Sequence, residues 1–290
     1  MIGATIGDMV GSPYELNTVL EVGRVDWEPL FHPTLSKFTD DTVLTMATAD
    51  AILTMCDTYS DTNGESFPPK FHLKYREWAR KYPNRGYGGT FWAWANQDLD
   101  VVNKSYADGC MMRCSPIGIF YWDSLDMSLK LAKESIQWTH NSPESLRGVS
   151  AITAAICMGF QGKSKQEIKA FVEEQYGCWL DCSVQTVRDT WDKRNIRCNI
   201  TCAQALICFL NSTDFESAIR LAVYSMGDCD TIAAIAGSLA EAFYGPQSIP
   251  RSMIDEAKKR LPQEMVDLMN KFYARVGMRG GKEPYKGFII

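Results

Sequence analysis

The sequence has no dense run of lysine and arginine, and its formal net charge is −5. Strong non-specific binding to nucleic acid depends on clustered positive charge, so we expect no nucleic-acid partner. No apolar run reaches the roughly 18 residues of a membrane-spanning helix, so we expect no membrane association. The first twelve residues lack a basic start and include Asp8, which is not typical of a secretory signal peptide. We therefore expect a cytoplasmic protein.

Strand signals are also scarce, and the sequence has no internal repeat or low-complexity tract. After Asp41 the apolar residues recur near the 3.6-residue period of a helix, and several later segments follow the same scheme between stop signals. The clearest of these are residues 146–160, 166–176, 202–210, 215–225, 231–244 and 253–261. The sequence therefore predicts an all-α fold, organised as one domain over residues 1–290.

The ten cysteines include three pairs with three intervening residues, namely Cys110/Cys114, Cys178/Cys182 and Cys198/Cys202. A spacing of four places two thiols on one helical face, where free cysteine behaves as a small core residue. No histidine lies near these pairs, and cytosolic thiols are usually reduced. We therefore predict free structural thiols. The alternative is a zinc site formed by the last two pairs.

One connection, from about Tyr82 to Pro116, is longer than the others and rich in glycine and aromatic residues. A long connection within a helical protein is either disordered or functional, and its aromatic residues disfavour disorder. We therefore interpret this segment as functional.

Two acidic clusters, Thr39-Asp40-Asp41-Thr42 and Asp228-Cys229-Asp230-Thr231, each precede an apolar helical segment. Adjacent carboxylates repel each other unless a cation or hydrogen-bond donors offset the charge. Carboxylate and hydroxyl oxygens are the ligands that magnesium and manganese prefer. Each cluster alone is equally well explained as a helix N-terminus, where carboxylates are favourable. The two together favour a metal site.

Two further residues are candidates for chemistry. Glu15 follows Gly11-Ser12-Pro13, through which a helix does not easily run, so its carboxylate should project from a turn. There it can act as a general base or position a water, or it can be a solvated surface residue. His140 is one of only three histidines and precedes a proline turn, and a lone histidine of this kind is more often structural than a ligand.

The chain resembles the ADP-ribosylglycohydrolase family along essentially its whole length. The resemblance is carried by Gly3-Ala4-Thr5-Ile6-Gly7-Asp8, Phe38-Thr39-Asp40-Asp41-Thr42-Val43, Tyr82-Pro83-Asn84-Arg85-Gly86-Tyr87-Gly88-Gly89, Met112-Arg113-Cys114-Ser115-Pro116-Ile117-Gly118, Thr139-His140-Asn141 and Gly227-Asp228-Cys229-Asp230-Thr231-Ile232-Ala233. The order and spacing of so many motifs make chance similarity improbable.

This resemblance implies a compact domain of orthogonally packed helices with two magnesium or manganese ions in a central cleft. The implied metal ligands are Thr39, Asp40, Asp41, Asp228, Asp230 and Thr231. The implied catalytic residues are Glu15, Asp41 and Asp230. The implied substrate contacts are Gly86, Tyr87, Gly88, Gly89, Asp108, Gly109, Met111, Met112 and His140, and Phe91, Trp92 or Tyr121 are candidates to stack on adenine.

The implied reaction is metal-dependent removal of ADP-ribose from an acceptor, either a protein side chain such as arginine or serine or a small conjugate. The sequence departs from the family pattern at three places. Ala107-Asp108-Gly109 stands where glycine-asparagine-glycine is expected, Ser142 stands in place of a second histidine, and Met226 replaces a glycine. These departures leave two alternatives: a hydrolase of another ADP-ribose or nucleotide conjugate, and a catalytically silent binding or structural member of the family.

Overall fold

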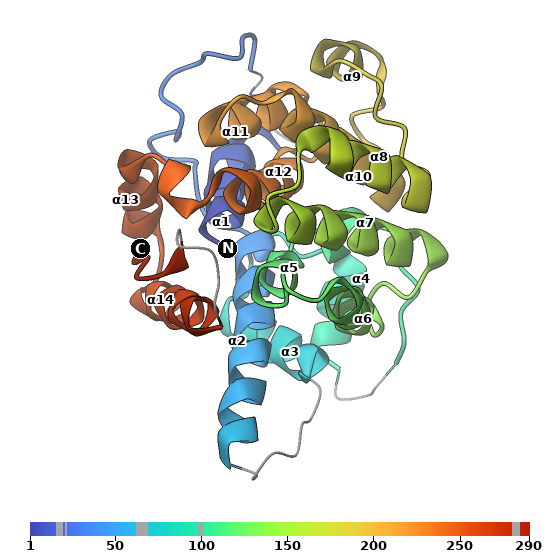
Figure 1. The fold of residues 1–290 in the computed structure, drawn as a ribbon. Helices are drawn as coiled ribbons and strands as arrows, with labels where there is room; N and C mark the ends of the chain where they lie inside the picture. Colours follow the sequence, from blue (N-terminus) through green and yellow to red (C-terminus); the bar gives the residue numbers. More distant parts are fainter. Residues whose placement is uncertain (16–19, 21, 62–68, 98–100, 280–284) are drawn as a thin grey trace.

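The computed structural model describes residues 1–15, 20, 22–61, 69–97, 101–279 and 285–290. In these residues the fold is all α-helical, as the sequence predicts, and β-pairing is limited to two isolated bridges, Lys104–His140 and Ala107–Arg197. The helices (Figure 1) are α1 (Ile2–Gly11), α2 (Asp40–Asp61), α3 (Phe71–Lys81), α4 (Gly89–Ala95), α5 (Ser115–Phe120), α6 (Leu125–Ile136), α7 (Pro143–Phe160), α8 (Lys165–Tyr176), α9 (Val184–Thr190), α10 (Cys198–Asn211), α11 (Phe215–Tyr224), α12 (Cys229–Tyr244), α13 (Arg251–Arg260) and α14 (Gln263–Met278). Three short 3₁₀ helices, η1 (Ser12–Tyr14), η2 (Asp108–Cys110) and η3 (Pro246–Ser248), lie between them.

The predicted helices differ from the observed ones by a few residues at their ends, and a capping side chain marks the start of α7, α8 and α11. Helix α8 begins at a capping box, in which Ser164 accepts from the backbone N–H of Glu167 and the Glu167 carboxylate accepts from that of Ser164. The same helix ends at Gly177, which adopts a left-handed φ of 68°. The pattern of apolar residues does not predict helix α1, because all its residues are buried and it has no polar face.

Helices α1 and α12 touch backbone to backbone at the centre of the molecule. Gly3, Gly7 and Gly11 lie at four-residue intervals, so they form one face of α1. A Cβ atom at Gly7 would lie 2.0 Å from the carbonyl oxygen of Ala233, and one at Gly11 would lie 2.6 Å from the backbone nitrogen of Asp230. Glycine is therefore required on this face, and it brings the start of α12 against the end of α1.

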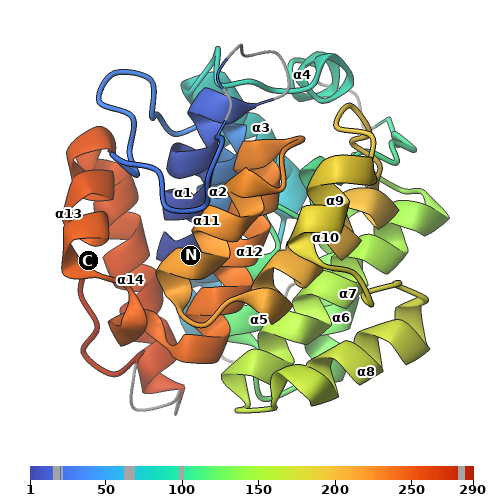
Figure 2. The same ribbon diagram turned by 90° about the horizontal axis from the view of Figure 1, so that it is seen from above.

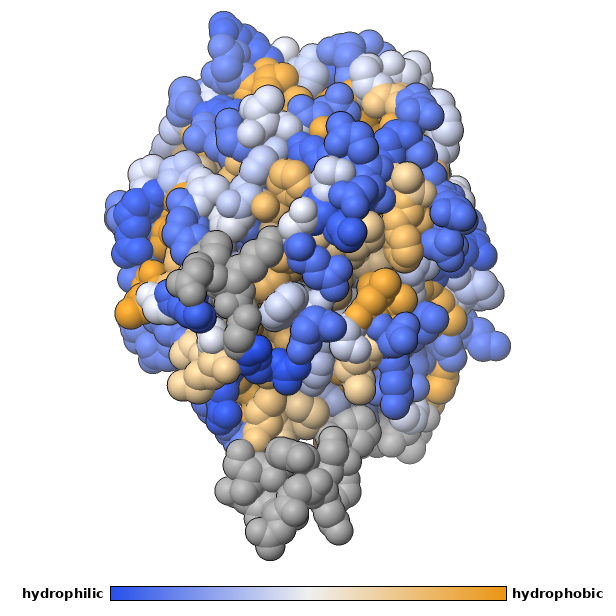
Figure 3. Space-filling view, in the orientation of Figure 1, coloured by the Kyte–Doolittle hydropathy of each residue, from blue (hydrophilic) through white to orange (hydrophobic). Residues whose placement is uncertain are grey.

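The remaining helices surround this central pair and α2 (Figure 2). Helices α13 and α14 lie on one side of it in both views, and α6, α7 and α8 lie on the other (Figures 1 and 2). On the face drawn in Figure 3, hydrophilic side chains predominate and hydrophobic ones form small separate groups. Within the described residues, no helix has the length and apolar character needed to cross a bilayer.

All ten cysteines are free thiols, as predicted. The helical explanation of their spacing holds for Cys198 and Cys202, which both lie on α10. It is wrong for Cys178 and Cys182, which lie in the extended segment between α8 and α9. The four thiols do not converge as a zinc site would require, since within the described residues the metal-binding side chains that cluster in threes are those of Glu15, Asp228 and Asp230.

Candidate active site

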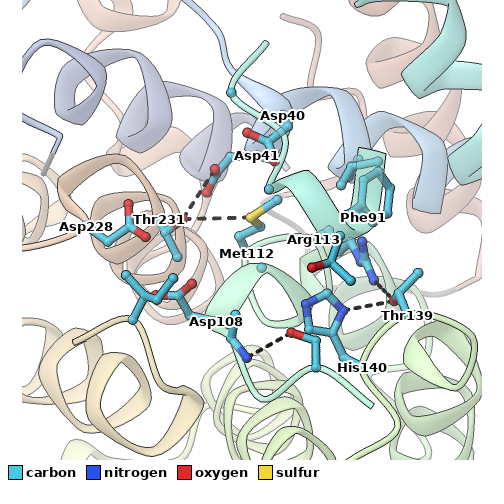
Figure 4. A pocket seen from close by; sticks show the side chains of 18 of the residues that line it. Asp40, Asp41, Phe91, Asp108, Met112, Arg113, Thr139, His140, Asp228 and Thr231 are labelled. Carbon is cyan, nitrogen blue, oxygen red and sulfur yellow. Dashed lines mark hydrogen bonds between the residues drawn. The ribbon is translucent and has the colours of Figure 1, made fainter. Parts of the chain in front are cut away.

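The two acidic clusters come together at the ends of two helices. Asp40 and Asp41 form the first turn of α2, while Asp228 precedes α12 and Asp230 and Thr231 lie in its first turn. Oγ1 of Thr231 lies 3.3 Å from Oδ2 of Asp41, which brings the two clusters into contact (Figure 4). The close contact between α1 and α12 contributes to this meeting of the clusters, because it holds Asp230 at the start of α12 against Gly11 at the end of α1.

A cavity of about 400 Å³ opens beside the joined clusters, a volume within the roughly 300–1,000 Å³ range typical of ligand sites. Most of the residues that the sequence predicts for the site line this cavity. They are Glu15, Asp40, Asp41, Gly86, Gly88, Gly89, Asp108, Gly109, Met112, His140, Asp228, Asp230 and Thr231. Residues from six separate stretches of the chain therefore meet in one cavity.

Three predicted residues, Thr39, Tyr87 and Met111, are not among those that line the cavity. Thr39 is buried under the start of α2. Tyr87 stacks on Phe91 with ring centroids 5.7 Å apart, and its hydroxyl donates to the carbonyl oxygen of Tyr82 at 2.9 Å. Met111 is buried, and its sulfur packs so closely on Gly148 that a Cβ atom added there would lie 2.8 Å away. The predicted contacts of Tyr87 and Met111 with a ligand are thus not direct contacts from the cavity wall.

Asp8, to which the sequence analysis gave no role, anchors the first acidic cluster. This fully buried carboxylate on α1 accepts from the backbone N–H and hydroxyl of Thr39, at 2.9 and 2.7 Å, and from those of Thr42, at 3.1 and 2.5 Å. Burial raises the pKa of Asp8 to about 6, while these four donors oppose the shift. A carboxylate within an apolar segment is costly unless it is bonded, which is the signal that could have identified it.

The carboxylates at the site repel one another. Burial, together with repulsion from Asp230 and other carboxylates, raises the pKa of Asp40 and of Asp41 well above the usual range. Burial and the neighbouring Asp108 do the same for Asp228, and burial and Asp228 do so for Asp230. Oδ1 of Asp41 is buried and has no hydrogen-bond partner in the described residues. Such a group is stable when a cation lies among the carboxylates.

Glu15 stands with the second cluster, at the end of η1. Its carboxylate and those of Asp228 and Asp230 place one oxygen each within 4.8 Å of one another. Glu15 is half-buried, and this burial raises the pKa of its carboxyl, with Lys37 acting in the opposite direction. The prediction that Glu15 projects from a turn is consistent with this placement, because α1 ends at Gly11.

The glycine-rich loop is docked on the first turn of α2. The backbone N–H of Asp40 donates to the carbonyl of Arg85 at 2.8 Å, and the Arg85 guanidinium lies 3.8 Å from the centre of the Phe38 ring. Gly86 follows with a φ of 100°, and a Cβ atom there would lie 3.1 Å from a carboxylate oxygen of Asp40. The loop therefore forms one cavity wall with backbone rather than side chains.

Asp108 lies in the opposite wall, buried rather than extended into the cavity. Its Oδ2 accepts from the hydroxyl of Thr201 at 2.6 Å, and its N–H donates to the carbonyl of Ile196 at 3.0 Å. Burial raises the pKa of this carboxyl to about 7. Ala107, which stands in place of a glycine, has a φ of −71°, a value that any residue adopts, so it puts no strain on the backbone.

The other two departures from the family pattern also have structural explanations. Ser142 caps α7, accepting from the backbone N–H of Ser145, and is not in the cavity wall. Met226 adopts a φ of 67°, a left-handed conformation that costs a non-glycine residue roughly 1–2 kcal/mol. Its carbonyl oxygen accepts from the Gln204 amide at 2.5 Å, which helps to hold this turn before Asp228.

His140 lies in the cavity wall next to Thr139 and Arg113, two lining residues that the sequence analysis missed. Of the three aromatic residues considered for adenine stacking, only Phe91 lines the cavity. Tyr121 is buried in the core against Phe120, with ring centroids 5.0 Å apart.

Comparison with known proteins bears directly on this site. The ADP-ribosylglycohydrolase family model matches residues 1–281. The chain is 26% identical to ADP-ribosylhydrolase ARH3 of Bos taurus over 323 aligned residues, covering 87% of this chain and 86% of that protein. It is 24% identical to ADP-ribosylarginine hydrolase Tri1 of Pseudomonas putida, covering 92% and 76%.

The fold is likewise similar to a solved structure described as an ADP-ribosylglycohydrolase-related protein complex, with a TM-score of 0.68, 25% identity and 95% of both chains covered. The family match spans nearly the whole chain and includes both acidic clusters and Glu15. The chain belongs to the ADP-ribosylglycohydrolase family and is a hydrolase of a glycosidic bond.

Proposed function

We propose that this enzyme cleaves the bond between the anomeric carbon of ADP-ribose and an acceptor atom, using two divalent ions. The observation that carries the proposal is the meeting of four carboxylates, those of Asp40, Asp41, Asp228 and Asp230, in one cavity wall, where the charged neighbours that shift their pKa values are other carboxylates. The family relationship supplies the substrate class.

The side chains present fit hard divalent ions. Magnesium and manganese favour carboxylate and hydroxyl oxygens, which the four aspartates, Thr39 and Thr231 provide. The unpaired buried oxygen of Asp41 is suited to such an ion. Thr39 donates its hydroxyl proton to Asp8, which leaves a lone pair of its Oγ1 for a cation. This oxygen lies 3.4 Å from Oδ2 of Asp41. Asp8 thereby orients a ligand without being one.

Bound ions of this kind supply a template for ribose hydroxyls and a water of lowered pKa. Glu15, close to Asp228 and Asp230, would accept a proton from the attacking water or hold the scissile group in line. Asp41 and Asp230 are the other two residues proposed to be catalytic. From the first turns of α2 and α12, they would hold the ions that position the reacting groups.

The acceptor that we propose is an ADP-ribosylated protein side chain, arginine or serine. Arginine is favoured by the similarity to a protein described as an ADP-ribosylarginine hydrolase. The test is a turnover assay with ADP-ribosylated arginine, ADP-ribosylated serine and small ADP-ribose conjugates, each with magnesium or manganese. Release of ADP-ribose from a side-chain substrate supports the proposal. Turnover of small conjugates alone would contradict the proposal and would favour the alternative, a hydrolase of another ADP-ribose or nucleotide conjugate.

Adding magnesium or manganese to metal-free protein should raise its melting temperature. A ligand at a hundred times its Kd stabilises the native state by about 2.7 kcal/mol, or roughly 5–10 °C for a chain of this size. Differential scanning fluorimetry against ion concentration measures the shift, and excess chelator should reverse it. A flat melting temperature across both ions would contradict the metal assignment.

Replacing Asp108 with asparagine should tighten ADP-ribose binding several-fold at saturating metal. Asparagine can still accept from Thr201, but it removes a charge that opposes the diphosphate, an effect on the order of 1 kcal/mol after screening. Because the pKa of Asp108 is about 7, the wild-type charge is present at pH 8 and largely lost at pH 6. The gain should therefore be larger at pH 8 and at low salt.

Calorimetric titration with ADP-ribose at two pH values and two salt concentrations measures this gain. Thr201→Val is the matched control, since it removes the hydrogen bond but keeps the carboxyl group. Because that bond lowers the pKa of Asp108, the control loses part of the charge at most and should tighten binding less than the asparagine variant. Equal or weaker binding by the asparagine variant would show that Asp108 does not act on the diphosphate.

A further inference from the structure

Arg113 is a fully buried cation without a carboxylate partner. Its side chain is 0% exposed, and no ion pair to it occurs within the described residues. Its charge is instead accommodated by aromatic faces, with the guanidinium carbon 4.2 Å from the centre of the Tyr75 ring and 5.5 Å from that of Phe91. Among the described residues only one of its nitrogens, Nη2, makes a hydrogen bond, and the acceptor is the hydroxyl oxygen of Thr139 at 2.7 Å. A residue this costly to bury calls for a specific role.

Thr139 connects this cation to the cavity. Its Oγ1 also lies 2.9 Å from Nδ1 of His140 (Figure 4). Arginine can only donate, so Thr139 must accept from Arg113 and has a single proton of its own to donate. The other acceptor within reach, the carbonyl oxygen of Ile136, is 3.4 Å away, beyond the roughly 2.5–3.0 Å range of O–H···O bonds. Thr139 is buried, so a proton with no acceptor would be costly.

The hydroxyl proton of Thr139 is therefore donated to Nδ1 of His140. An imidazole that accepts at Nδ1 carries its own proton at Nε2 if it is neutral. Burial, and after it the Arg113 charge, keep the pKa of His140 well below its usual range, so the ring is neutral.

We propose that Arg113 is a positioning residue, which acts through Thr139 to hold His140 in the tautomer that presents an Nε2–H donor to the cavity. The donation runs in one direction, from guanidinium to hydroxyl to imidazole. The donor that emerges would meet an oxygen of the ligand, such as a phosphoryl oxygen of the ADP-ribose diphosphate. This inference rests on the proposed function for the identity of the ligand, but the tautomer itself does not depend on it.

The surroundings of Nε2 leave space for such a ligand. A Cβ atom at Gly109 would lie 3.8 Å from Nε2, so the glycine keeps the cavity side of the ring uncovered by a side chain. The ring is also fixed from behind, because the backbone N–H of His140 donates to Ile136 and that of Asn141 donates to Asn103, at 2.7 and 2.9 Å.

The test is the His140 tautomer, measured by long-range proton–nitrogen correlation NMR on metal-loaded protein. With only three histidines, the His140 signals are assigned by comparison with His140→Gln. Wild-type protein should show the Nε2–H form. Thr139→Val, which is similar in shape but has no hydroxyl, should populate the Nδ1–H form, and Thr139→Ser should restore the wild-type pattern. Loss of one such hydrogen bond should weaken ADP-ribose binding about tenfold in Thr139→Val.

Arg113→Gln should produce the same tautomer change, and the double variant with Thr139→Val should be no worse than either single one. If Arg113→Gln does not fold, the comparison of Thr139→Val with Thr139→Ser still tests whether the Thr139 hydroxyl sets the His140 tautomer. An Nδ1–H tautomer in wild-type protein, or no change in Thr139→Val, would overturn the proposal. Absence of any ADP-ribose binding by wild-type protein would instead count against the proposed function, while the tautomer would still report on the relay.

Discussion

Asp41→Asn should lower the turnover rate about a thousandfold, equivalent to roughly 4 kcal/mol of transition-state stabilisation, while the metal-free protein melts no earlier than wild type. Asparagine has nearly the same shape, but it lacks the charge that a divalent ion requires. In the absence of metal, the carboxylate of Asp41 is buried and repelled by Asp230, with Oδ1 unpaired. Removing its charge should therefore leave the free energy of unfolding unchanged or higher.

The combination of the two effects is what identifies a functional residue. A structural carboxylate would lose stability on substitution, because its donors would be left unsatisfied. The metal-dependent rise in melting temperature should also disappear in Asp41→Asn. Steady-state kinetics, together with melting curves recorded with and without magnesium or manganese, measures all three quantities on one protein.

Asp50→Asn provides the matched control for this experiment. Asp50 lies on the same helix, outside the cavity, and its carboxylate accepts from the indole of Trp78 and pairs with Lys74, both at 2.9 Å. This variant should keep full turnover and the full response to metal. Activity of Asp41→Asn within tenfold of wild type would show that the first turn of α2 does not hold an essential ion.

The sequence predicts the acidic clusters well because each one is local. A carboxylate run directly before an apolar helix can be recognised in a few residues, and both clusters do begin helices, α2 and α12. The glycine-rich segment is also marked locally, by its length and its aromatic residues, and Gly86, Gly88 and Gly89 do line the cavity. These features depend on neighbouring residues in the chain.

Features that depend on distant residues could not be predicted in this way. Asp8 has no local partner, since its donors come from Thr39 and Thr42, more than thirty positions away. Arg113 looks like an isolated charge in a run of apolar residues until its aromatic neighbours and Thr139 are known. The burial of Asp108 likewise depends on Thr201, on a helix that the local sequence does not connect with it.

Gly7→Ala is the change from which we expect the largest loss of stability. The Cβ atom that it adds would lie 2.0 Å from the carbonyl oxygen of Ala233 and 2.7 Å from the backbone nitrogen of Ala234. Both atoms belong to the backbone of α12, so the contact cannot be relieved by a rotamer change. Helix α1 must move away from α12, and packing along the whole interface is lost.

We expect the free energy of unfolding to fall by about 3 kcal/mol or more, at the upper end of the cost of overpacking, and the melting temperature to fall by roughly 10 °C. Chemical denaturation and scanning calorimetry measure these changes. Gly23→Ala is the control, because its Cβ atom would meet no heavy atom within 4 Å, and it should shift stability by less than about 0.5 kcal/mol.

Gly11→Ala separates the structural role of this interface from its effect on the site. Its added Cβ atom would lie 2.6 Å from the backbone nitrogen and Cα of Asp230, so the displacement falls on a proposed metal ligand itself. Where Gly7→Ala remains folded, we expect near-normal metal affinity per folded molecule, because its clash lies at Ala233, three residues further along α12. Folded Gly11→Ala should bind magnesium or manganese more weakly. Equal metal affinity in the two variants would mean that the close approach of α1 and α12 stabilises the fold without positioning the Asp230 carboxylate.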